Sequence, residues 1–380
     1  MSVQTVEAPA PAPAPPKKLG RIDGLDLMRV FASCMVVIGH IAAWFALGHT
    51  GWWLTDWAET DIGGTFHLNP NLAFIGVGSF LMISGVVVTH VTDREGPGTF
   101  LYRRITRLAP LLWVVTPIAW IMINLGLRVS GVRDPNLDVV ELLRGMVLGN
   151  FFTIPQIGFV GVTWTLLVQV VFYLYVSATI PLLRKRPWIP PAIAAAVAFI
   201  AIMLSTLART SVFGTGRVWT HEAGVWATYL PLLCIGQLIS LVYAGKLNRY
   251  AALALGSVHY LLFVWADRIG GFTFQGDAMP RTVLLLILLL LLMMRVNGPL
   301  SRSRFIKEWS RRTYAIYLVH LMCLYPVMDV LVPRIGPELA VLIGLAVLAV
   351  VSDLLHRFVE MPADRWLRAR RRTKAPTRAG

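Results

Sequence analysis

Two ionisable residues lie inside the first long apolar segment of the chain. Arg29 and His40 are eleven positions apart within residues 25–47. In an α-helix, eleven steps make three turns plus roughly 20°, so both side chains would leave one face about 16.5 Å apart along the axis. Such groups are costly in a membrane unless they face the protein interior or a water-filled cavity. We expect this face to line a functional chamber. The alternative is an arginine that only bridges helices, with a hydrogen-bonded core histidine.

The composition indicates a membrane environment. Hydrophobic residues make up 56% of the 380 residues, charged residues only 14%, and the mean hydropathy is +0.64. A soluble domain of this length would lack the polar surface to cover itself. The sequence therefore predicts an all-α polytopic membrane protein whose helices surround a central polar cavity. The net charge of +15 fits contact with anionic lipid. Because no nucleic-acid-binding motif accompanies the basic residues, we expect the bilayer as a partner and no nucleic acid.

Ten segments are long and apolar enough to cross about 30 Å of hydrocarbon. The expected spans are 25–47, 72–91, 107–127, 163–183, 189–207, 223–244, 250–266, 281–295, 313–332 and 337–357. With the first residues in the cytoplasm, 27 of the 35 Lys and Arg residues fall on the inner side. By the positive-inside rule, this bias predicts a multi-pass protein with both termini cytoplasmic.

The regions outside these spans have their own signals. Residues 1–20, rich in Ala and Pro, are expected to form a disordered cytoplasmic tail, followed by a transmembrane domain over 21–362 and a basic cytoplasmic tail over 363–380. The stretch 138–160 is expected to be a non-spanning outer element, because its short amphipathic pattern suits an interfacial or re-entrant helix. Widely separated Cys34, Cys234 and Cys323 predict neither disulfides nor a metal site.

A cluster of arginines stands at the inner end of the third span. Arg104 and Arg107 are three positions apart on the predicted helix, and Arg103, which precedes them, is expected to bind a phosphate-bearing donor with them. Two guanidinium groups spaced in this way can converge on one phosphate. The alternative is ordinary charge that fixes topology. Arg29 is expected at the same membrane depth, with Asp26 three residues before it to hold its side chain, which favours a site for a phosphate-bearing donor.

Two other spans contain polar residues. Ser84 and Gly85 lie deep in the second span, where close helix packing and function explain a small polar pair equally well. In the ninth span, Tyr317 and His320 share one helix face, and His320 could be a site residue or a hydrogen-bonded core residue.

Together these residues form a pattern that resembles the acyltransferase 3 family of integral membrane acyltransferases, almost from end to end. The first helix has an opening like the family's Leu-Asp-Gly-Leu-Arg, with Leu27 in place of Gly, and keeps the spacing from Arg29 to His40. The other similar motifs are Phe80 to Gly85, Arg104 with Arg107, Trp164 to Gln169, Tyr314 to His320, and Phe358 to Pro362, which contains Glu360. One position departs from the family, because Gln169 stands where a carboxylate is usual. An amide can position a hydroxyl but cannot act as a general base.

The resemblance implies acyl transfer, commonly of acetyl from acetyl-CoA, to a hydroxyl group, with no tightly bound cofactor. Acetyl-CoA would be gripped at the cytoplasmic side by Arg29, Arg104 and Arg107, while His40 acts as the general base. An acyl-enzyme intermediate on His40, Ser33 or Ser84 is the alternative to direct transfer.

The acceptor is open at this point. The 29 Arg against 6 Lys indicate a high-GC bacterium and hence a bacterial plasma membrane. The resemblance then implies an envelope glycolipid or polysaccharide, as for the trehalose monomycolate acetyltransferases, or else a secreted macrolide-type antibiotic. A lipid or glycan transporter without bond chemistry is the alternative of a different class.

Overall fold

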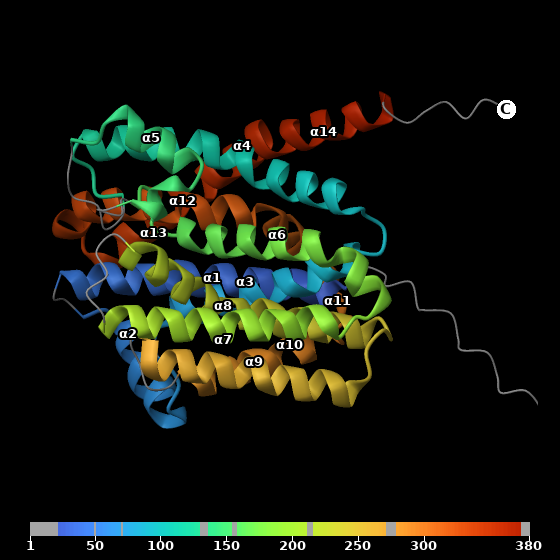
Figure 1. Ribbon diagram of the computed structural model, residues 1–380. Coiled ribbons are helices and arrows are strands. Elements are labelled where there is room, and N and C mark those ends of the chain that lie inside the picture. The colour runs from blue at the N-terminus through green and yellow to red at the C-terminus, as the bar shows by residue number, and fades with distance from the viewer. Residues whose placement is uncertain are drawn as a thin grey trace, which may run out of the picture.

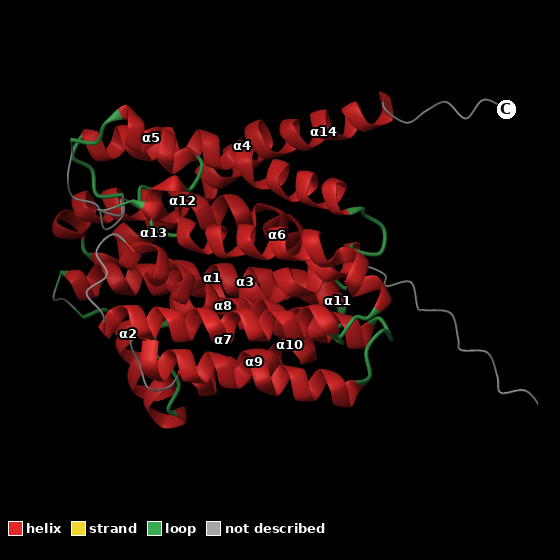
Figure 2. Ribbon diagram, viewed as in Figure 1, coloured by secondary structure: helices red, strands yellow, loops and turns green. Residues whose placement is uncertain are grey.

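The computed structural model describes residues 22–48, 51–69, 71–129, 136–153, 158–210, 216–270 and 279–373. Helices and short loops build all of these residues, and none of them forms a β-strand (Figure 2). The predicted all-α fold is therefore confirmed. The expected tail over residues 1–20 lies outside the described residues, as do residues 374–380.

Each of the ten expected spans falls on a helix. The helices are α1 (Asp23–Leu47), α3 (Leu72–Val91), α4 (Pro97–Asn124), α6 (Thr163–Lys185), α7 (Ile189–Thr210), α8 (Gly216–Tyr243), α9 (Arg249–Gly270), α10 (Met279–Met293), α12 (Arg304–Ile335) and α13 (Pro337–Leu355). In the described part of the chain, nine helices are long and apolar enough to cross a membrane, whereas α10, with 15 residues, is shorter. A multi-pass membrane protein follows from this architecture.

The spans form a bundle of roughly parallel and antiparallel helices with α3 and α8 at its centre (Figure 1). Helix α3 packs mainly on α8 and α1, and α1 packs in turn on α12. Glycines allow the closest of these contacts, since a Cβ at Gly85 would overlap the carbonyl oxygen of Leu233, and one at Gly236 would overlap that of Met82. The two central spans, α3 and α8, thus pack closely because each has a glycine at the point of contact.

Short elements complete the two ends of the bundle. In Figure 1, α2 (Trp53–Trp57) and α5 (Val139–Met146) lie at the left end, and α11 (Pro299–Arg302) lies at the right end. The remaining elements are the π-helix η1 (Ala58–Gly64), the 3-10 helix η2 (Gly149–Phe152), the π-helix η3 (His356–Glu360) and α14 (Met361–Thr373).

The stretch 138–160 contains no helix long enough to span a membrane within its described residues. Helix α5 has eight residues and begins with a capping box, in which Asp138 accepts from the Glu141 backbone and Glu141 accepts from the Asp138 backbone. The indole of Trp120 donates to the carbonyl oxygens of Leu137 and Asp138, which fastens this end of α5 to α4. The expected short, non-spanning helix is confirmed.

Candidate active site

On helix α1, the carboxylate of Asp26 holds the Arg29 side chain in place. The Arg29 guanidinium donates to Asp26 Oδ1 at 2.9 Å, and the Ser310 hydroxyl of α12 donates to the same oxygen at 2.7 Å. Asp26 is buried, while Arg29 is half-buried. The expected contact between Asp26 and Arg29 is confirmed, and it fixes the direction in which Arg29 points.

Helix α4 presents two guanidinium groups that lack a carboxylate. It begins at Pro97, ten residues earlier than the expected span, so Arg104 and Arg107 lie within its regular turns. Among the described residues, neither arginine has a hydrogen bond or ion pair, and Arg104 Nε is buried without an acceptor. The guanidinium carbon of Arg104 lies 5.4 Å from the centre of the Phe100 ring. Neither group has a carboxylate within ion-pair distance among the described residues. Arg103 points elsewhere and pairs with Glu95.

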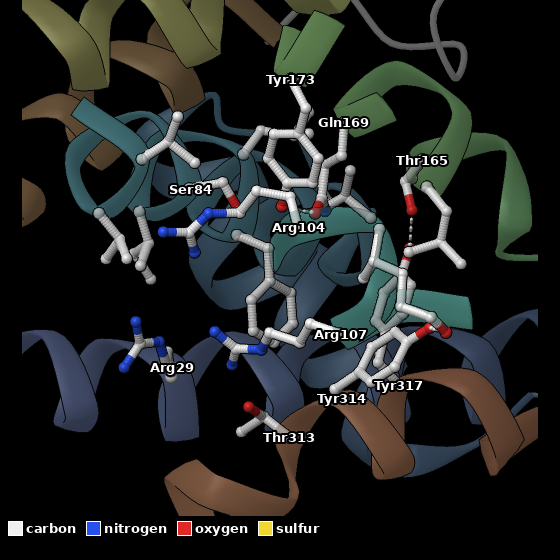
Figure 3. Close-up of a pocket in the computed structure, with 18 residues that line it drawn as sticks. Arg29, Ser84, Arg104, Arg107, Thr165, Gln169, Tyr173, Thr313, Tyr314 and Tyr317 are labelled. Atoms are coloured by element: carbon white, nitrogen blue, oxygen red, sulfur yellow. Dashed lines mark hydrogen bonds between the residues drawn. The ribbon is translucent and has the colours of Figure 1, made fainter. Parts of the chain in front are cut away.

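A cavity of about 120 Å³ brings most of the predicted site residues together. Arg29, Ser84, Arg104, Arg107, Gln169 and Tyr317, from five different helices, line what we call the central cavity. Figure 3 shows the three guanidinium groups turned toward the same space, with Ser84 beside Arg104. The expected convergence of Arg29 with the two arginines of α4 is therefore seen in the structure.

Hydroxyl groups line the side of the central cavity formed by α6 and α12. The Thr165 and Tyr317 hydroxyls are hydrogen-bonded to each other at 2.7 Å, and both lie within donating distance of the Val162 carbonyl oxygen, at 2.9 and 3.4 Å. One turn further along α6, the Tyr173 hydroxyl donates to Gln169 Oε1 at 3.2 Å. Gln169 thus uses its carbonyl oxygen as an acceptor, a role that a carboxylate could also fill.

Four polar lining residues were not predicted as site residues from the sequence: Thr165, Tyr173, Thr313 and Tyr314. Three of them lie one helical turn from a predicted site residue. Thr165 and Tyr173 are four residues before and after Gln169, and Thr313 is four residues before Tyr317. Extending the face of each predicted site residue by one turn would have found them.

His40 and His320 form a pair that lies outside the lining of the central cavity. His320 Nε2 is 3.2 Å from His40 Nδ1, and the His320 ring centre is 6.1 Å from that of Tyr317, which does line the cavity. His320 is fully buried, whereas His40 is partly accessible. The sequence placed both imidazoles in spans, and the structure adds that they touch.

The hydrogen bonds of the pair determine where its protons lie. His320 Nδ1 is 2.7 Å from the carbonyl oxygen of Tyr317, and His40 Nδ1 is 2.8 Å from that of Val36. Since a carbonyl oxygen only accepts, both Nδ1 atoms carry hydrogen in the neutral pair. His320 Nε2 is then an acceptor, so the Nδ1–H of His40 is shared between His320 Nε2 and the carbonyl oxygen of Val36. His40 Nε2 is left with its lone pair, as a general base requires.

The other predicted site residues lie away from the central cavity. Trp164 packs against Tyr229, with ring centres 4.8 Å apart, and Glu360 Oε2 lies 2.5 Å from His356 Nδ1. Within the described residues, no group of three or more His, Cys, Asp or Glu side chains gathers as a metal site would require.

A second polar cluster lies one turn beyond His40 on α1. Trp44 Nε1 donates to Asp329 Oδ1 at 2.7 Å, and Arg128 Nε donates to Asp329 Oδ2 at 3.0 Å. The Arg128 guanidinium also lies over the rings of Trp44 and Tyr325, at 5.4 and 5.3 Å. The Tyr325 hydroxyl donates to the backbone oxygen of His40 at 3.3 Å. The buried Tyr325 and the more accessible Trp44, Arg128 and Asp329 connect His40 to the end of the bundle that carries α2 and α5.

Comparison with known proteins agrees with this geometry. The chain is 25% identical over 335 residues to Nodulation protein 10 of Rhizobium leguminosarum bv. viciae, covering 80% of this chain and 84% of the relative. It is also 25% identical over 392 residues to Acyltransferase MdmB of Streptomyces mycarofaciens, covering 94% of this chain and 95% of the relative. No solved structure matches the chain.

The family comparison covers most of the chain and includes both the arginines of the central cavity and the histidine pair. Residues 22–357 match the model of the acyltransferase domain. The similarity includes every predicted site residue except Glu360, which lies just beyond the matched segment. The chain therefore belongs to the acyltransferase 3 family and is a multi-pass membrane acyltransferase.

Proposed function

We propose that the enzyme transfers an acetyl group from acetyl-CoA, bound from the cytoplasmic side, to a hydroxyl group of an envelope glycolipid or polysaccharide at a bacterial plasma membrane. The observation that carries this proposal is the pair of arginines without carboxylate partners, Arg104 and Arg107, at the central cavity. Arg104 is half-buried with its Nε buried without an acceptor, which is unfavourable in the free protein, whereas Arg107 is exposed. A phosphate-bearing donor would supply both guanidinium groups with the negative charge that they lack.

The length of α1 supports a reaction in which the residues that grip the donor lie far from the catalytic base. Arg29 and His40 are on one continuous helix, Asp23–Leu47, so their separation along the axis is about 16.5 Å by helical rise. In the proposal, the arginines grip the donor where it enters the central cavity, and the thin pantetheine arm extends past Tyr317 toward His40. The edge of Phe80 packs on Tyr317, with ring centres 5.6 Å apart, and these two rings would border the arm.

His40 is the proposed general base. Its Nε2 takes the proton of the acceptor hydroxyl as that oxygen attacks the thioester carbonyl carbon, which forms the new ester bond. The C–S bond then breaks, and the CoA thiolate leaves with the proton returned by His40. His320 is the proposed positioning residue, because its Nε2 accepts from His40 Nδ1–H and so holds the imidazole with Nε2 available.

We propose direct transfer rather than an acyl-enzyme intermediate. The Ser33 hydroxyl donates to the Val30 carbonyl at 2.8 Å and accepts from Trp309 Nε1 at 3.0 Å, so both of its hydrogen-bonding roles are engaged within the protein. Ser84 has no adjacent imidazole in the contacts of the described residues. Direct transfer therefore requires only the base that the geometry already supplies.

The polar cluster near His40 supports an acceptor with several hydroxyl groups. Asp329, Arg128 and Trp44 combine a carboxylate, a guanidinium and an indole ring, which provide hydrogen-bond acceptors, donors and an apolar face. An acceptor entering from this end would meet the cluster before it reached His40.

The test combines a purified enzyme with a comparison of strains. The protein in nanodiscs should release free CoA from acetyl-CoA only when an envelope extract is added, and radiolabelled acetyl should move to one component of that extract. Mass spectrometry of a deletion strain should show the same component lacking one acetyl group. If acetyl-CoA is not consumed with any envelope fraction, or if only a longer acyl group is missing, the proposed donor is wrong.

A further inference from the structure

A larger cavity adjoins the central cavity where α4, α12 and α14 meet. It measures about 620 Å³, and its lining includes Arg107, Arg311, His356, Glu360 and Arg365. We call it the flanking cavity. Its side chains come from two helices of the bundle and from the segment after α13, in which η3 leads into α14. The proposed reaction does not yet use this space.

The two cavities meet at a shared wall. Arg107, Thr313 and Tyr314 line both of them. The Tyr314 hydroxyl donates to the carbonyl oxygen of Leu108 at 2.9 Å, so the tyrosine is anchored to α4 next to Arg107. A molecule could therefore occupy the flanking cavity and reach the central cavity past a residue that would bind its phosphates on the way.

The sizes of the two cavities indicate which part of a donor each of them could hold. The central cavity measures about 120 Å³, and the flanking cavity measures about 620 Å³. The central cavity is therefore the narrower space and suits a thin arm, whereas the flanking cavity offers more room for the bulkier nucleotide.

The charges of the flanking cavity favour an anion. Three arginines line it against two carboxylates, those of Glu360 and Asp364. Glu360 is already engaged by His356, at 2.5 Å. Arg365 has no hydrogen bond or ion pair among the described residues, and Arg311 has an exposed partner, Glu308, at 2.6 Å. Such exposed pairs are weak and can be exchanged for a phosphate.

From these observations we infer that the flanking cavity binds the nucleotide end of acyl-CoA, with Arg311 and Arg365 contacting its phosphates and the pantetheine arm passing between Arg107 and Tyr314 into the central cavity. The inference rests on the proposed function in one respect, namely that the donor is a CoA thioester. It assigns a donor-binding role to α14, a helix outside the segment that matches the family.

The test compares a complete donor with a truncated one. Acetyl-CoA carries the nucleotide, whereas acetyl-pantetheine has the same thioester arm without it. In the full-length enzyme in nanodiscs, the double variant Arg311→Ala with Arg365→Ala should raise KM for acetyl-CoA about tenfold or more, because charge-assisted contacts to phosphate are lost. KM for acetyl-pantetheine should change by less than about twofold, since this donor makes no such contacts.

Inhibition by adenosine 3′,5′-bisphosphate gives a second readout. It should compete with acetyl-CoA in the wild-type enzyme and inhibit the double variant much less. The matched control is Arg186→Ala with Arg304→Ala, which removes the same charge from exposed positions that do not line either cavity. This control should keep the wild-type KM for both donors.

The possible failures can be told apart. If wild-type enzyme uses neither acetyl-CoA nor acetyl-pantetheine with any acceptor, the proposed function fails. If it uses both, but the arginine variant loses them equally or the control behaves in the same way, only this inference is overturned. Competition by phosphatidylglycerol vesicles, but not by phosphatidylcholine vesicles or the bisphosphate, would assign the cavity to a lipid headgroup and would also overturn it.

Discussion

Neighbouring residues in this enzyme have different tasks because a helix turns about 100° per residue. Arg104 lines the central cavity, while Arg103 pairs with Glu95. Similarly, Ser84 faces the cavity, and Gly85 lies against the backbone of α8. The sequence left packing and function open for this small pair, and the structure assigns packing to Gly85 and a place at the cavity to Ser84.

Replacing His40 tests the base directly. His40→Ala removes the Nε2 lone pair, so the rate of acetyl transfer should fall by about 10²- to 10⁴-fold, the usual contribution of general base catalysis. KM for the donor should change little, because the arginines remain. The measurement is kcat and KM for acetyl-CoA in nanodiscs, with His90→Ala as the control, a histidine of α3 that does not line the central cavity. Activity above a tenth of wild type in His40→Ala would show that the base is another group.

At the scale of helices, the sequence predicted the apolar helices better than the contacts between them. Each of the ten apolar runs falls on a helix, and nine of these helices are long enough to cross a membrane, because hydropathy is a local property. The sequence placed Arg104 on a helix that extends beyond the apolar span at 107–127, and the structure starts this helix at Pro97, since a proline is favourable in the first turn. The contact between His40 and His320 joins residues 280 positions apart, and no local pattern contains that information.

The crossing of α3 and α8 can be tested through glycine. A Cβ at Gly85 would overlap the backbone of Leu233, while a Cβ at Gly98, in α4, would have no atom within 4 Å. Gly85→Ala should therefore destabilise the protein by roughly 1–3 kcal/mol through overpacking. Gly98→Ala should be neutral or slightly stabilising, since Ala is the better helix former. Thermal unfolding in detergent measures both, and a melting temperature for Gly85→Ala at or above that of Gly98→Ala would contradict the close crossing.

At the scale of the whole molecule, the orientation in the membrane is predicted from charge alone. The structure separates the two ends of α1, since Gly24 lies against the backbone of Met293 and Val296, whereas η1 follows the opposite end. The preference of 27 basic residues for one side supplies the expected orientation.

Cysteine labelling checks the orientation. After Cys34, Cys234 and Cys323 are replaced by Ala, a single cysteine is introduced either at Thr60 in η1 or at Asn297, both exposed positions. A membrane-impermeant maleimide should label Thr60→Cys in intact spheroplasts and Asn297→Cys only after lysis. The reverse pattern would place the arginine cavities on the outer side and would exclude a cytoplasmic donor.

In the proposed reaction, the continuous helix α1 limits how long the arm of the acyl donor can be. Because Asp23–Leu47 is one regular helix, the interval between Arg29 and His40 is fixed by backbone hydrogen bonds and cannot stretch as a loop would. The length of the helix between Arg29 and His40 therefore sets the length that the donor arm must have. An anchored carrier with a shorter arm would stop before the imidazole, and one with a longer arm would have to fold back on itself.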